Sequence, residues 1–109
     1  MTQAAAVGAV MRTLADPTRR AVFERIVKSE EITVAELTRG SGVTQSAVSQ
    51  HLRSLKQAGL IVDRPEGRRV HYRADARGLA PLVDWMALYA VFWRERFANL
   101  KTLLKEIDS

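Results

Sequence analysis

The side chains best suited to bind a polar partner lie between positions 44 and 57, where apolar residues recur at helical spacing. On a helical wheel of about 100° per residue, Val48, Leu52 and Leu55 fall together and define a buried face. Hydroxyls, amides and cations occupy the rest of the wheel. Such groups donate and accept hydrogen bonds at nucleic acid base edges, where glutamine suits adenine and arginine suits guanine. The residues expected to face such a partner are Thr44, Gln45, Ser46, Ser49, Gln50 and Arg53.

A second group of cations surrounds a glycine turn. Residues 60–62 and 69–74 have the composition and alternation of two strands, and residues 65–67 read as the turn between them. A glycine at the tip lets a hairpin approach a duplex closely, and arginine is favoured in a narrow minor groove. Arg68 is therefore expected at the tip of a DNA-contacting wing, with Arg69 beside it and Arg64 and Arg73 close by.

The distribution of charge also favours a polyanionic partner. The chain has 109 residues, 17 Lys and Arg, 12 Asp and Glu, and a net charge of +5. Residues 39–77 contain eight basic and three acidic side chains, whereas basic and acidic residues balance in the segments on either side. An excess of cations in one segment strengthens binding to phosphates. The alternatives are a solvated basic face, a plain polar helix surface and a hairpin with no partner.

Catalysis and metal binding have little support in the sequence. There is no cysteine, which rules out disulfides, thiolate ligands and cysteine nucleophiles. The two histidines, His51 and His71, show no metal-ligand spacing, and no nucleophile, base and acid stand in a recognisable arrangement. We expect His51 to pack beside the apolar stripe with one ring nitrogen hydrogen-bonded, and His71 to lie on the exposed strand face within reach of a phosphate. No enzyme activity, metal or cofactor is expected.

The elements that must position these residues can be traced from caps and periodicity. Residues 4–14 form a first helix, and Asp16-Pro17 is a good start for a second that ends near Ser29. Thr33 and Glu36 have capping-box spacing at the start of a short helix that runs through Leu37.

A tight turn separates this short helix from the polar one. Gly40 and Gly42 mark the turn, and the next helix covers about 44–58. Two helices joined in this way and followed by a hairpin form a winged helix-turn-helix, whose second helix enters the major groove. Helical periodicity resumes from about Leu79 to Ile107. The predicted fold is mainly α with a small β-hairpin, in one domain over residues 1–109.

The last helix is too apolar to remain exposed. Residues 85–93 are apolar on every side of about two turns, and later apolar residues follow with heptad spacing. A small domain has few elements to cover such a helix, so we expect a homodimer through the terminal helices, although part of the stripe belongs to the chain's own core. The predicted interface residues are Val7, Met11, Trp85, Trp93, Phe97, Leu100, Leu104 and Ile107.

Three motifs resemble one known family. Residues 14–20 (LADPTRR), 43–52 (VTQSAVSQHL) and 58–61 (AGLI) resemble, in order and spacing, the ArsR-type winged-helix repressors of bacteria. The resemblance implies a homodimeric transcriptional repressor, in some members an autorepressor, that binds an operator with two-fold symmetry. Many members release DNA when a metal binds cysteines, or histidines of the last helix. This chain has neither, so metal sensing is not carried over.

These observations predict a sequence-specific repressor of double-stranded DNA. Two other functions stay open: a sensor that responds to a small ligand or metal, and a dimeric protein-interaction module that does not read DNA. No apolar run approaches the roughly 20 residues of a membrane helix, and the first residues lack the features of a signal peptide. We therefore expect a soluble, cytoplasmic protein without membrane contact, and no particular effector is indicated.

Overall fold

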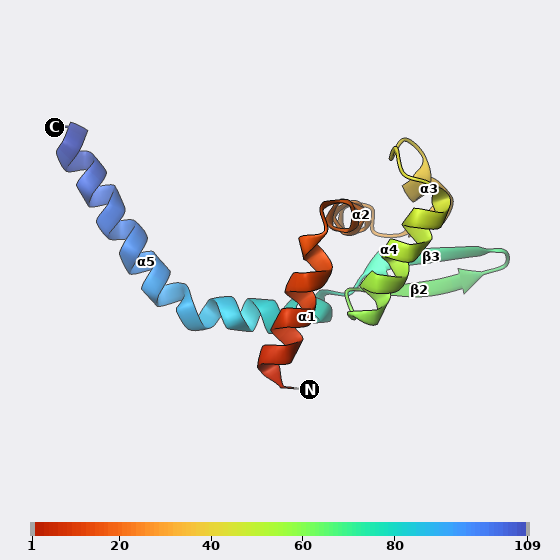
Figure 1. Ribbon diagram of the computed structural model, residues 1–109, viewed down its shortest axis with the longest axis horizontal. Helices are drawn as coiled ribbons and strands as arrows, with labels where there is room; N and C mark the ends of the chain where they lie inside the picture. The colour runs from red at the N-terminus through yellow and green to blue at the C-terminus, as the bar shows by residue number, and fades with distance from the viewer. Residues whose placement is uncertain (1, 109) are drawn as a thin grey trace.

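The structure, a computed structural model, describes residues 2–108 and is mainly helical with a small antiparallel sheet, which confirms the predicted fold class (Figure 1). The elements in chain order are α1 (Gln3–Ala15), α2 (Pro17–Lys28), β1 (Ile32–Thr33), α3 (Val34–Thr38), α4 (Gln45–Gln57), β2 (Ile61–Glu66), β3 (Arg69–Ala74), the 3-10 helix η1 (Ala76–Leu79) and α5 (Ala80–Asp108).

The helices α2 and α3 begin at the side-chain caps that the sequence predicts. The Asp16 carboxylate accepts a hydrogen bond from the backbone N–H of Arg19 at 3.0 Å, directly before Pro17 at the start of α2. The Thr33 hydroxyl accepts from the N–H of Glu36 at 3.3 Å and donates to the Glu36 carboxylate at 2.9 Å. In the predicted capping box, that carboxylate accepts a hydrogen bond from the Thr33 N–H. It binds the hydroxyl instead, and the backbone of Thr33 belongs to β1.

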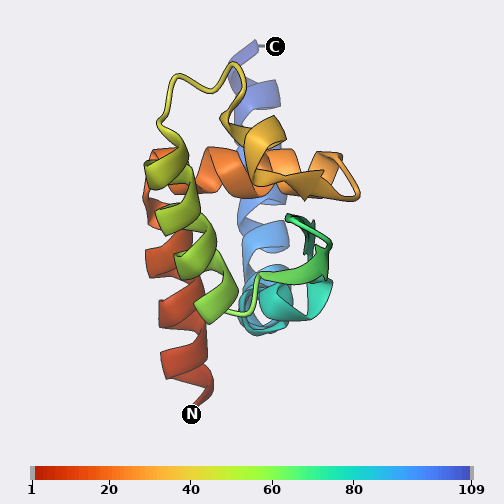
Figure 2. The ribbon, with the colours of Figure 1, turned by 90° about the vertical axis from the view of Figure 1, so that its right-hand side faces the viewer.

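The core forms where α2, α3 and α4 meet the start of the sheet. Val48, Leu52 and Leu55 are 0%, 2% and 0% exposed, so the predicted buried face of α4 is confirmed. They join Ile26 of α2 and Leu37 of α3 in one apolar cluster. In Figure 2, α2 crosses behind α4. Burying one face of α4 in this way turns its polar face outward.

The long helix α5 extends away from this core (Figure 1). It contacts α1 and η1 near its beginning, and none of its residues whose burial is described is buried. The radius of gyration is 18.4 Å, against about 13 Å for a compact chain of this length. The projecting helix accounts for the difference.

The sheet differs from the predicted two-stranded hairpin in two respects. Its order is β1-β3-β2, because Ile32 and Thr33 pair with Tyr72 and His71 of β3. β1 is only two residues long, too short for a periodic signal. The turn also lies further along the chain than predicted. Glu66 pairs with Arg69, so β2 continues through Pro65 and the turn consists of Gly67 and Arg68.

Local backbone chemistry explains the shifted turn. Pro65 is tolerated because β2 is an edge strand, where a missing N–H removes no necessary ladder bond. Gly67 has φ 61°, and Glu30 is the only non-glycine residue with positive φ in the described part of the chain. A positive φ followed by a negative one is the pattern of the type II′ hairpin turn. Gly67 thus holds the first turn position, and Arg68 the second.

Gly78 allows η1 to lie against the turn that follows α4. A Cβ atom on Gly78 would overlap the carbonyl oxygen of Gly59 and lie 2.9 Å from the Cα atom of Leu60. Both are backbone atoms, so the chain itself would have to move.

We predict that Gly78→Ala lowers the free energy of unfolding by about 1–3 kcal/mol, because it overpacks this contact. Gly8→Ala is the matched control. A Cβ there meets only the flexible Arg12 side chain, at 3.1 Å. In the middle of α1, alanine should be neutral or stabilising by up to about 1 kcal/mol. Urea denaturation at one fixed protein concentration measures both, and equal stabilities for the two variants would contradict the assigned contact.

Candidate nucleic-acid interface

The outward face of α4 carries most of the predicted site. One shallow hollow in the surface is lined by Gln45, Ser46, Ser49, Gln50 and Arg53, all from α4. Within residues 2–108, none of these five side chains makes an intramolecular hydrogen bond or salt bridge. Their donors and acceptors are therefore available to a partner without breaking a contact in the protein.

The turn before α4 is held by its own hydrogen bonds. Gly40 and Gly42 have positive φ, as the predicted tight turn requires. The Ser41 hydroxyl donates to the Thr38 carbonyl at 2.8 Å and accepts from the Val43 N–H at 3.1 Å. Thr44 caps α4 by accepting from the Ala47 N–H at 3.1 Å. This leaves the N–H groups of the first α4 residues pointing out of the helix end, where a phosphate can bind.

The wing reaches the same side of the molecule as the start of α4. Arg68 occupies the hairpin turn, Arg69 begins β3, and both are exposed. A cleft connects these two arginines to Gln45 and to α3. It is lined by Thr33, Val34, Ala35, Glu36, Arg39, Gln45, Arg68, Arg69, Val70 and Tyr72.

Several cations of the basic middle segment are neutralised by carboxylates of the same chain. Lys56 lies 2.8 Å from Asp63, and Arg77 lies 2.9 Å from Asp75. The hydrogen bond from Lys56 lowers the pKa of Asp63, and the same bond raises the pKa of Lys56. By contrast, Arg53, Arg68 and Arg69 belong to no salt bridge among the described residues. The structure therefore divides the basic residues into structural cations and available ones.

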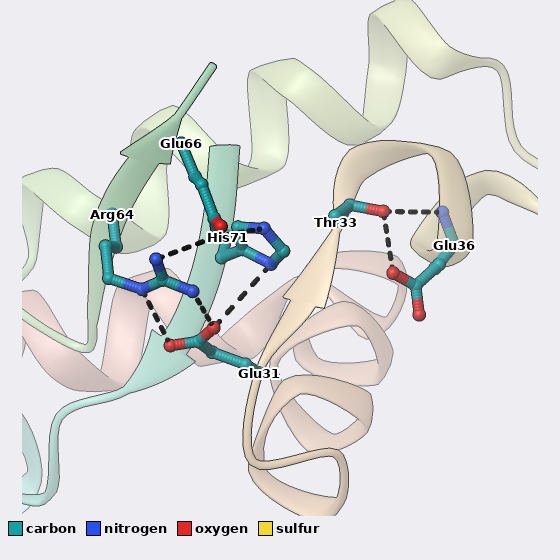
Figure 3. A network of polar contacts seen from close by, with 6 residues as sticks. All are labelled: Glu31, Thr33, Glu36, Arg64, Glu66 and His71. Atoms are coloured by element: carbon teal, nitrogen blue, oxygen red, sulfur yellow. Dashed lines mark hydrogen bonds and ion pairs between the residues drawn. The ribbon is translucent and has the colours of Figure 1, made fainter. Parts of the chain in front are cut away.

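A polar network along the wing contains Arg64 (Figure 3). The Arg64 Nε and Nη2 atoms donate to the two carboxylate oxygens of Glu31, the first at 3.1 Å, and Nη1 donates to Glu66 at 2.9 Å. The bond from Arg64 lowers the pKa of Glu31, and the bond to Glu31 raises the pKa of Arg64. Three donors of Arg64 are therefore occupied by carboxylates of its own chain.

His71 also belongs to this network, on the same face of β3 as the exposed Arg69 and Arg73, as predicted. Its side chain is 21% exposed, with Nδ1 3.6 Å from Glu31 and Nε2 3.3 Å from Glu66. The expectation that it reaches a phosphate is corrected, because two carboxylates flank its ring. The strand register places His71 opposite Arg64, which the hairpin alternation could have indicated. Glu31 lies 33 positions before Arg64 in the chain, and nothing in the local sequence pattern links them.

The remaining predicted residues are those of the dimer interface and His51. Val7 is 5% exposed within its own chain, so its place in the predicted dimer interface is corrected: little of its surface remains for a partner. The other predicted interface residues are exposed in the single chain, from 39% for Trp85 to 76% for Ile107. His51 is half-buried as expected, but its Nδ1 atom is buried and has no hydrogen-bond partner within residues 2–108.

Two further properties concern residues 2–108 as a whole. No helix there is both long and apolar enough to cross a bilayer. No cluster of three or more His, Asp or Glu side chains in this range is arranged to hold a metal ion.

Comparison with known proteins connects this geometry to transcriptional regulators. A family model described as a helix-turn-helix domain matches residues 14–64. An HTH-type transcriptional regulator of Mycobacterium tuberculosis is 49% identical over 71 residues, covering 65% of this chain and 65% of that protein. The biofilm growth-associated repressor of Agrobacterium fabrum is 32% identical over 90 residues, covering 83% of this chain and 74% of the repressor.

A solved structure gives the same relationship in three dimensions. The crystal structure of a possible transcriptional regulator for arsenical resistance superposes with a TM-score of 0.65 and 39% identity, covering 84% of this chain and 92% of that one. The chain spans half to about two thirds of the length of the first curated relatives that it matches, 50% and 65%.

We predict that Gln50→Ala and Arg68→Ala each change the free energy of unfolding by less than about 0.5 kcal/mol, because neither side chain holds a partner in the described chain. Leu52→Ala, on the buried side of the same helix, should cost about 2–5 kcal/mol. Urea denaturation measures all three. A large loss for Gln50→Ala or Arg68→Ala would assign that residue a structural role.

Proposed function

The chain belongs to the ArsR-type family of winged helix-turn-helix transcriptional regulators, and from that membership we propose that it is a sequence-specific DNA-binding repressor. It acts in the cytoplasm as a homodimer on an inverted-repeat operator, through a single winged helix-turn-helix domain over residues 1–109. The observation that carries this proposal is the unpartnered polar face of α4 beside two unneutralised wing arginines. Its task is binding, not catalysis.

The recognition helix α4 lies in the major groove. Ser46 and Ser49 are small enough to let the helix approach the floor of the groove. Gln50 hydrogen-bonds adenine, and Arg53 binds guanine or a nearby phosphate. Thr44 and Gln45 lie at the N-terminus of α4, where backbone N–H groups and the helix dipole favour a phosphate. The buried face formed by Val48, Leu52 and Leu55 holds this orientation.

The wing contacts the neighbouring part of the duplex. Arg68 occupies the second position of the hairpin turn, where it can enter the minor groove, and Arg69 binds the backbone. Contacts to phosphates add affinity without sequence preference, and the minor groove distinguishes base pairs less fully than the major groove. Specificity therefore comes from α4, and a general increase in affinity comes from the wing.

Dimerisation supplies the second recognition helix. The exposed apolar residues of α5, with Met11 of α1, form a surface that a second copy can cover. Along α5, Trp93, Phe97, Leu100, Leu104 and Ile107 follow heptad spacing. Two α4 helices held by a rigid interface select two half-sites at one fixed spacing, which an inverted repeat provides. Repression follows when the bound dimer occupies a promoter.

Binding to the DNA upstream of the protein's own gene tests the proposal. Fluorescence anisotropy should show tighter binding to this DNA than to random DNA of equal length. Affinity should fall on the order of a thousandfold between 50 and 200 mM salt if six or more phosphates are contacted, because counterions are released on binding. Equal affinity for both DNAs, or affinity independent of salt, would contradict the proposal.

Two substitutions separate readout from general affinity. Gln50→Ala should reduce the preference for operator over random DNA by about 1–3 kcal/mol, whereas Arg68→Ala should weaken binding to both. Gln57→Ala, at the far end of α4, is the matched glutamine control and should change neither. Parallel losses for Gln50→Ala and Arg68→Ala on the two DNAs would refute these roles.

The interface is tested by placing a charge in it. Phe97→Asp and Leu104→Asp should produce monomers or aggregates, because an unpaired carboxylate would be buried between two copies. Thr102→Asp introduces the same charge on the exposed α5 surface away from the heptad positions and should leave a dimer. Sedimentation equilibrium distinguishes these states. Intact dimers of both seam variants would exclude the α5 interface.

A further inference from the structure

The polar network along the wing joins three separate segments (Figure 3). Glu31 comes from the turn between α2 and β1, Arg64 and Glu66 from β2, and His71 from β3. The Arg64 guanidinium donates two hydrogen bonds to the two carboxylate oxygens of Glu31 and a third to Glu66. A bidentate pair fixes direction as well as distance. The network therefore fastens the hairpin to the segment that leads into the helix-turn-helix.

The backbone around Glu31 is arranged for this contact. Glu30 has φ 56°, a left-handed conformation that is uncommon for a glutamate. Immediately after Glu31, Ile32 and Thr33 pair with β3. The wing is thus attached to the same short segment twice, once by the strand pairing and once by the side chains around Arg64.

The location of the network matters for the wing tip. Glu66 is the last residue of β2 and directly precedes the Gly67-Arg68 turn. A two-stranded hairpin is only marginally stable by itself, so its tip samples many directions unless the strands are held. Holding the strands close to the turn limits where Arg68 can lie relative to α4.

We propose that Glu31 is a positioning residue for DNA binding: through Arg64 it holds the wing so that Arg68 and Arg69 face the duplex together with α4. This inference rests on the function proposed above. The direction of the change in DNA affinity tests this inference, because a carboxylate near a DNA-binding surface opposes binding by charge alone. Removing it should strengthen binding if charge is its only effect, and weaken binding if it positions the wing.

The test compares Glu31→Gln with Glu30→Gln. Both remove one negative charge from adjacent positions, but only Glu31 contacts Arg64, and Glu30 makes no hydrogen bond or ion pair among the described residues. We expect Glu31→Gln to bind the upstream DNA about five- to tenfold more weakly than wild type, and Glu30→Gln to bind equally or slightly more tightly. If Glu31→Gln binds as tightly as Glu30→Gln, the positioning role is overturned.

A double-mutant cycle shows whether Glu31 acts through the wing. Residues that work as a unit are not additive. The loss of affinity caused by Arg68→Ala should shrink by at least half in the Glu31→Gln background, whereas the loss caused by Gln50→Ala should be the same in both backgrounds. Additive losses for Glu31→Gln and Arg68→Ala would overturn the proposal.

Arg64→Lys provides an independent variant. Lysine keeps the positive charge but cannot make the bidentate contact with Glu31. We expect it to weaken DNA binding by a similar five- to tenfold. Affinity equal to wild type would show that the network does not position the wing.

Amide hydrogen exchange without DNA separates loosening of the wing from loss of fold. In Glu31→Gln, amides of β2 and β3 should exchange faster while those of α4 stay protected. Unchanged exchange in the sheet, or general loss of protection, overturns the positioning role.

If wild type shows no preference for its upstream DNA, the proposed function itself fails. Wild-type specificity with an unaffected Glu31→Gln variant overturns only this inference.

Discussion

The structure depends on the burial of one face of α4. Val48, Leu52 and Leu55 lie in the cluster with Ile26 and Leu37, and this contact decides the direction in which every other α4 side chain points. A rotation of the helix by a third of a turn would bury the polar residues and expose apolar ones, at a cost of several kcal/mol. Hydrophobic packing of one face of α4 therefore sets the direction of its opposite, hydrogen-bonding face, which takes no part in the packing.

Salt bridges within the chain separate the basic residues into a paired group and an unpaired group among the described residues. Lys56, Arg64 and Arg77 hold carboxylates of their own chain, whereas Arg53, Arg68 and Arg69 have no such partner within residues 2–108. Each exposed pair contributes little to stability. Their effect is on the charge that a partner meets, because each pair neutralises a cation together with a carboxylate. The number of basic residues in the segment, eight, thus overstates the number of cations available to a polyanion.

The sequence predicted those features that arise from local chemistry. The caps at Asp16, Thr33 and Thr44 and the apolar stripe of α4 all depend on residues within a few positions of each other, and all were found where expected. The errors involve contacts between distant segments. β1 exists because Ile32 and Thr33 meet β3, and His71 is drawn into the network by Glu31. Pro65 suggested a turn, but its position on an edge strand lets β2 continue. Likewise, the sequence could not assign Val7 to the chain's own core, because that depends on how the helices cross.

The exposed apolar length of α5 has a consequence for how the protein responds to its own abundance. A freshly synthesised copy carries Trp93, Phe97 and Leu100 uncovered, which favours self-association or capture by a chaperone. In the proposed dimeric repressor, pairing comes before occupancy of the operator. While most copies are single, the population of pairs rises with the square of total concentration. A twofold change in synthesis then alters promoter occupancy by up to fourfold, so the uncovered helix makes gene control steeper than a monomeric regulator could achieve.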